Sequence, residues 1–228
     1  RHAKTIRGSR PGEENKDWER IVTAFNKWVR EERKSIGLER PLDFQRFLAR
    51  DFEFYARLYG DLRRVAQSYQ DARQTGLESV HYNANNGFTL QYPLILSGID
   101  PDDSDEVVRR KIRVISAFID IFLARRFVNF KTTAGEATKG RVFNWILAIR
   151  SLGLKDIVDY FGERLDEMDA QEEAFLGVSD FSMHQQNKRR VHHILARLTD
   201  AIEVWSGGES SFDRYSSTKA RTRFEVEH

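Results

Sequence analysis

Residues 112–124 read IRVISAFIDIFLA, and this stretch decides the fold class. Only Arg113, Ser116 and Asp120 are not apolar in it, and at helical spacing these three positions form one narrow stripe. A helix that is apolar on its other sides must be wrapped by neighbouring elements. The apolar run is shorter and more interrupted than the roughly 20 residues that a membrane-spanning helix needs. The sequence therefore predicts a buried central helix.

The predicted central helix covers residues 103–130. Asp103 followed by Glu106 is typical of a helix start, and Arg125 with Arg126 suits the negative end of the helix dipole. Apolar residues recur at helical spacing through much of the remaining chain. The composition, with 40% hydrophobic residues and only 4 Pro, also favours long helices. We expect an all-α fold, an irregular multi-helix bundle around the central helix.

The predicted domain organisation has four parts. Residues 1–16 form a flexible basic segment, and residues 17–207 form the helical domain. Residues 208–222, rich in Ser, Gly and Arg, form a linker. Residues 223–228 alternate apolar and acidic side chains, which predicts a short β-strand that begins a further domain. Within the helical domain, residues 75–88 carry turn signals and are predicted to be a loop.

Composition restricts the possible function classes. The chain has no cysteine, which excludes disulfides and thiolate metal sites and fits a cytoplasmic location. Residues 1–16 are polar, so they do not have the pattern of a signal peptide. We expect no membrane partner.

Charge is unevenly distributed along the chain, although the formal net charge is only +2. Residues 1–10, 184–199 and 214–223 each contain four basic residues and no acidic residue. Basic segments on an otherwise acidic chain indicate a polyanionic partner such as DNA, and ordinary solvated faces and linkers are the alternative. The candidate DNA contacts of the second segment are Lys188, Arg189, Arg190 and His193.

Sites of chemistry are sparse. The sequence lacks a phosphate-binding loop and a nucleophile elbow. His192 and His193 are neighbours on a predicted helix and point about 100° apart, so they cannot face one metal together. Glu227 and His228 end the predicted strand as an acid–His pair. In a ββα-metal nuclease such an acid binds a divalent metal and the histidine acts as general base, whereas the simpler interpretation is a strand or tail.

Several short motifs follow one another in an informative order. They are Gln91–Leu96, Phe122–Arg126, Asn129, Thr132-Thr133, Phe143, Lys188–Leu198 and Phe224–His228. In this order they resemble the GmrSD family of modification-dependent restriction endonucleases and related phage-defence proteins. Members of that family combine an N-terminal ParB-like domain, which senses or hydrolyses nucleotide, with a helical region and a C-terminal HNH-type nuclease.

The resemblance implies that the chain is the central helical region of such a DNA-cleaving protein, coupling the nucleotide domain to the nuclease. By position, Glu227 corresponds to a ligand of Mg²⁺ and His228 to the general base. Arg125 and Arg126 match paired arginines of the family, with either a structural or a DNA-facing role.

The sequence also departs from the family pattern. It lacks the nucleotide-domain motifs and the nuclease residues that follow the first histidine. We therefore expect this chain alone to be catalytically inactive, to hold no cofactor, and to bind DNA weakly and without sequence specificity. The alternative function is a helical protein-interaction or oligomerisation module without a nucleic-acid role. Under either function, a second copy of the chain, in a homo-oligomer, is a candidate partner.

Overall fold

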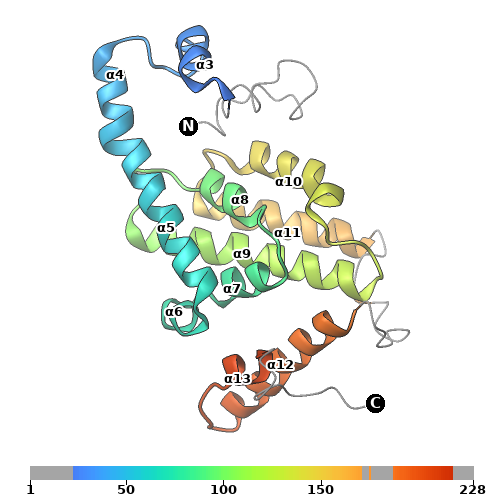
Figure 1. Cartoon of the computed structure of the whole chain (residues 1–228). Helices are drawn as coiled ribbons and strands as arrows, with labels where there is room; N and C mark the ends of the chain where they lie inside the picture. Colours follow the sequence, from blue (N-terminus) through green and yellow to red (C-terminus); the bar gives the residue numbers. More distant parts are fainter. Residues whose placement is uncertain (1–22, 171–174, 176–186, 218–228) are drawn as a thin grey trace. The chain divides into compact units, whose positions relative to one another are not determined.

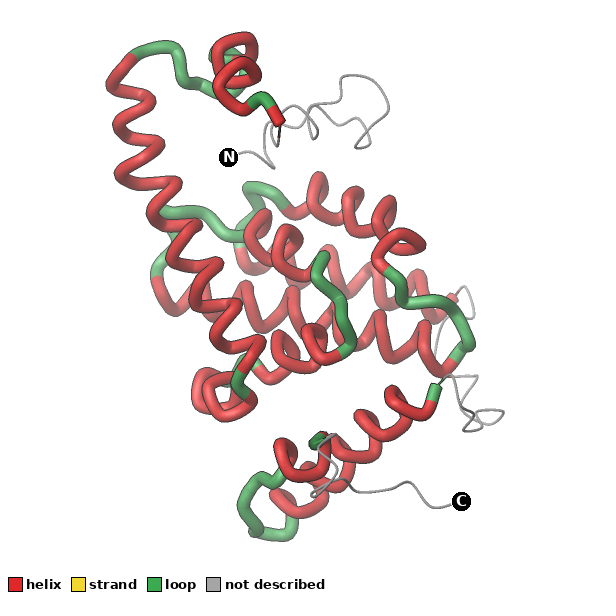
Figure 2. The backbone as a smooth tube through the Cα atoms, viewed as in Figure 1, coloured by secondary structure: helices red, strands yellow, loops and turns green. Residues whose placement is uncertain are grey.

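The computed structural model describes residues 23–170, 175 and 187–217 (Figure 1). Within these residues the backbone forms helices joined by turns and loops, and the described part contains no strand (Figure 2). The all-α prediction is confirmed. The chain divides into two units, Arg1–Leu176 and Gly177–His228. The predicted segment 1–16 and the predicted strand 223–228 lie outside the described residues.

The first unit contains most of the helices. In chain order they are α3 (Phe25–Glu32), α4 (Pro41–Arg46), the π-helix η1 (Phe47–Phe52), α5 (Glu53–Gln67), α6 (Tyr69–Thr75), α7 (Glu78–Asn85), α8 (Gln91–Gly98), α9 (Asp105–Val128), α10 (Gly135–Ile149) and α11 (Leu154–Ala170). The π-helix η1 connects α4 to α5 without a break, and Asp51 within it is buried.

Helix α9 is the buried centre of this unit, as predicted. It packs against α7, α8 and α11 (Figure 1). Phe118 on α9 stacks on Phe161 of α11, with 4.1 Å between ring centroids. Trp145 of α10 meets Phe118 and Phe122 edge-on at 4.8 and 5.0 Å. Such aromatic pairs stabilise a core beyond their buried area, and here they join three helices.

Helix α7 and the turn before it contact the polar stripe of α9. The side-chain amide of Asn83 donates a hydrogen bond to the carbonyl oxygen of Ser116 at 3.0 Å. Arg113 Nε donates to the carbonyl oxygen of Gly76, also at 3.0 Å. Ser116 and Asp120 are buried. The stripe therefore faces protein partners, because polar groups inside a core require hydrogen-bond partners.

The predicted loop at residues 75–88 is wrong, because it contains α7. The turn signals were real but mark the two ends of this helix. Gly76 caps α6 in a left-handed conformation, and Gly87 has a positive φ just after α7. Val80 and Asn83 between them are buried.

Helix α9 is two residues shorter at each end than the predicted 103–130, and its N-cap differs from the predicted Asp103. Ser104 is the N-cap, and its hydroxyl accepts from the Val107 backbone N–H. The Asp103 carboxylate instead accepts from the Asp100 backbone N–H and from Lys111 Nζ. Lys111 is buried, so the carboxylate neutralises a charge at the edge of the core.

The second unit contains α12 (Lys188–Trp205) and α13 (Phe212–Ser216), which pack together. Phe212 is fully buried. The described part of the predicted linker 208–222 thus includes a helix. The sequence analysis missed it because two aromatic residues, Phe212 and Tyr215, among Ser and Gly are too few to show a periodicity.

Candidate nucleic-acid interface

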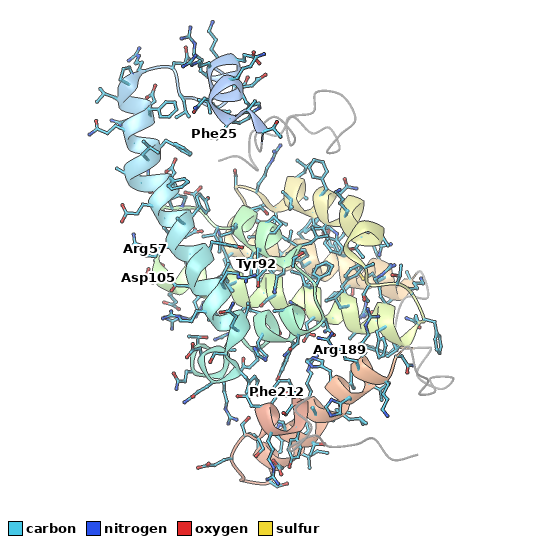
Figure 3. The ribbon with its side chains drawn as sticks, viewed as in Figure 1. Phe25, Arg57, Tyr92, Asp105, Arg189 and Phe212 are labelled. Carbon is cyan, nitrogen blue, oxygen red and sulfur yellow. The ribbon has the colours of Figure 1, made fainter. Side chains whose placement is uncertain are left out.

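The first turn of α12 carries Lys188, Arg189 and Arg190 in succession. This turn contains no acidic residue. Arg189 is exposed, whereas Lys188 and Arg190 are half-buried (Figure 3 labels Arg189). Three cations at the positive end of a helix dipole are electrostatically unfavourable for the helix. The turn therefore concentrates three positive charges in succession, and an anion bound beside them would reduce their mutual repulsion.

The titration of Arg190 reflects this environment. Its pKa is lowered, first because burial disfavours the charged guanidinium and second because Arg189 repels it. Arg190 nevertheless remains charged near neutral pH, since an arginine is effectively always protonated. A phosphate beside the two arginines would offset both effects.

His193 lies on the same side of α12 as Arg189 and Arg197, at intervals of four residues. Its ring meets Phe212 of α13 edge-on, with centroids 5.7 Å apart (Phe212 is labelled in Figure 3). His193 is half-buried. It thus helps to join α12 to α13, and Arg197 adds a cation that was not among the predicted contacts.

Arg125 has its polar contacts within the first unit. Its Nη1 donates to the Leu165 carbonyl oxygen at 3.1 Å, and its Nη2 pairs with Asp169 at 3.0 Å. The guanidinium also lies 5.7 Å from the centroid of the Phe175 ring. Of the two roles that the sequence left open, these contacts favour the structural one, because the buried side chain ties the end of α9 to α11.

Arg126 is half-buried at the last turn of α9. Its Nε donates to the Thr132 carbonyl oxygen at 2.7 Å, and its guanidinium lies over the Phe122 ring at 5.5 Å. These contacts hold the start of the loop after α9. A DNA-facing role for Arg126 stays a prediction.

A groove between α10 and α11 was not expected from the sequence. It has a volume of about 240 Å³ and is lined by Arg141, Asn144, Trp145, Tyr160, Arg164, Glu167 and Met168. Arg164 pairs with Glu167 and lies 5.1 Å from the centroid of the Tyr160 ring. Burial raises the pKa of Tyr160, and the nearby Arg164 partly opposes this rise. Because Glu167 neutralises Arg164, the groove offers limited attraction for an anion.

Glu227 and His228 lie outside the part of the chain that the structure describes, so the predicted metal ligand and general base stay predictions. Among residues 23–170, 175 and 187–217, no group of three or more His, Asp or Glu side chains is placed to hold a metal ion. No helix in these ranges is long and apolar enough to cross a membrane.

No protein-family model matches the chain, and no significant match was found among curated proteins or among solved structures. The resemblance to GmrSD-like proteins therefore depends on the motifs alone.

Proposed function

We propose that this chain is the helical region of a GmrSD-like DNA-cleaving defence protein and that α12 contacts the DNA backbone. The observation that carries the proposal is the first turn of α12. Lys188, Arg189 and Arg190 follow one another there at the positive end of the helix dipole, and no acidic residue belongs to this turn.

The chemistry of this turn suits phosphate better than bases. Guanidinium groups donate paired hydrogen bonds to phosphate oxygens, and the helix N-terminus adds partial positive charge. Backbone contacts of this kind fix position on a duplex but carry no sequence information. In the complete protein, α12 would hold DNA while the helical region relays the state of the nucleotide domain to the nuclease.

A comparison of two charge-matched variants tests DNA binding. The first replaces Lys188, Arg189 and Arg190 by Gln. The control replaces three arginines of α5 by Gln and so lowers the net charge equally: Arg57, Arg63 and Arg64. Fluorescence anisotropy with a labelled duplex at low salt should show weakened binding for the α12 variant and little change for the control. Equal weakening would show that net charge, and not α12, determines the affinity.

The nuclease part of the proposal has a separate test. In a protein that contains the complete HNH domain, His228→Ala should abolish cleavage in the presence of Mg²⁺ while DNA binding through α12 persists. Retained cleavage would remove His228 as the general base without affecting the assignment of α12.

A second candidate function is the helical interaction module. It is favoured by one observation, the large apolar side chains that α12 exposes away from α13. This feature does not depend on DNA binding.

A further inference from the structure

Helix α12 has two opposite faces with different surroundings. One face packs on α13: Ala196 and Asp200 are buried, and Asp200 accepts hydrogen bonds from the Ser210 hydroxyl at 2.6 Å and the Ser211 backbone N–H at 2.7 Å. The Tyr215 hydroxyl donates to Glu203 on the same side. This face therefore already has its partner.

The opposite face exposes four large apolar side chains. Their exposed fractions are 41% for Leu195, 54% for Leu198, 60% for Ile202 and 83% for Trp205. With half-buried Val191 they follow one another at intervals of four, three, four and three residues. We call these five residues the α12 seam. Apolar residues at alternating intervals of four and three are typical of a helix that packs along another helix in a coiled coil.

We propose that the α12 seam is a self-association surface that pairs antiparallel with the seam of a second copy of this chain. The spacing is self-complementary in that direction. A two-fold axis between residues 196 and 197 places Leu195 opposite Leu198 of the partner subunit and Val191 opposite Ile202 of the partner subunit. The same axis places position 188 opposite the partner subunit's Trp205, and a lysine beside a tryptophan allows a favourable cation–π contact. The interface is then isologous, as in a two-fold dimer.

Charge favours the antiparallel direction over the parallel one. Three of the four Lys and Arg residues of α12 lie in its first turn, and its last turn contains no basic residue. Antiparallel pairing brings each basic first turn next to the negative end of the partner's helix dipole. Parallel pairing would bring two basic first turns together, with Lys188 facing its own copy.

The contact is short, because a helix of 18 residues is only about 27 Å long at a rise of about 1.5 Å per residue. We therefore expect a reversible dimer, which forms as the protein concentration rises and dissociates on dilution, and not an obligate dimer.

Sedimentation velocity across a range of protein concentrations tests the proposal. The wild-type chain should shift from monomer to dimer as concentration rises. Leu198→Glu places a charge in both central layers of the dimer and should weaken association by about a hundredfold or more. The control is Val158→Glu on α11 of the first unit, because Val158 is an exposed apolar residue, 45% against 54% for Leu198, that is not part of the seam. This control should still form dimers.

Cysteine cross-linking determines the direction, because the wild-type chain has no cysteine. In the antiparallel dimer, Lys188→Cys alone should give little disulfide dimer, since two copies of that position are about 26 Å apart along the helix. A mixture of Lys188→Cys and Trp205→Cys chains should give a disulfide-linked heterodimer. Strong cross-linking of Lys188→Cys with itself would overturn the antiparallel arrangement.

Two further results would overturn self-association. One is a wild-type chain that stays monomeric at every concentration, with Leu198→Glu lowering its thermal stability; the seam would then be covered within the chain. The other is a Leu198→Glu variant that forms dimers as well as the wild type does.

Discussion

The ion pair between Asp103 and Lys111 provides a quantitative prediction for the fold. Lys111 Nζ lies 2.7 Å from Asp103 Oδ2 and 3.0 Å from the Leu152 carbonyl oxygen. The side chain of Lys111 is 2% exposed and that of Asp103 is 17% exposed. The change Asp103→Asn keeps the size of the side chain and an acceptor for the Asp100 N–H, but it removes the charge that neutralises Lys111.

The expected cost follows from this burial. Removing one partner of a buried ion pair costs about 3–5 kcal/mol, because the other charge is left uncompensated. Asp103 is partly exposed, so we expect about 3 kcal/mol, the lower end of the range. The matched control is Asp61→Asn, which breaks an exposed pair with Arg64 of similar length, 2.8 Å. That change should cost no more than about 1 kcal/mol.

Urea unfolding followed by far-ultraviolet circular dichroism measures both costs. Adding Lys111→Met to Asp103→Asn should restore much of the lost stability, since no unpaired charge then remains. Equal losses for Asp103→Asn and Asp61→Asn, or no recovery in the double variant, would refute the reasoning.

Three further predictions concern packing and titration. Gly98→Ala should cost about 1–3 kcal/mol in urea unfolding, because an added Cβ would lie 2.7 Å from Ile115 Cδ1; full stability would contradict the close approach of α8 to α9. Asn83→Ala should cost about 1–3 kcal/mol because its amide donates to an α9 carbonyl; a neutral result would show that this bond is dispensable. The pKa of Tyr215 is raised, chiefly because its hydroxyl donates to Glu203. This contribution to stability is present below the ordinary phenol pKa of about 10 and is lost as pH rises through the higher folded-state value. Ultraviolet titration should therefore show one tyrosine ionising earlier in Glu203→Gln, and an unchanged titration would contradict the contact.

The fold could be predicted where the sequence signal is local. Residues 112–124 have so few polar side chains that burial follows from composition alone. The choice between Asp103 and Ser104 as the cap could not be made, because it depends on Lys111 reaching back to Asp103. Helix α7 was missed because its apolar residues are few and turn signals stand at both ends.

The candidate site could likewise be predicted only where its residues are neighbours in the sequence. The cations of α12 are adjacent in the sequence, so a charge count identifies them. The role of Arg125 depends on Leu165 and Asp169, which lie about forty residues further along the chain. The groove lined by Arg141 and Arg164 likewise forms only when α10 and α11 pack together.

The salt dependence of DNA binding tests the central claim most directly, namely that the first turn of α12 neutralises DNA phosphates. For duplex DNA each neutralised phosphate contributes about 0.9 to the negative slope of log K against log salt concentration. We predict that replacing Lys188, Arg189 and Arg190 by Gln makes this slope shallower by about 2–3. An identical slope for the wild type and this variant would contradict the account.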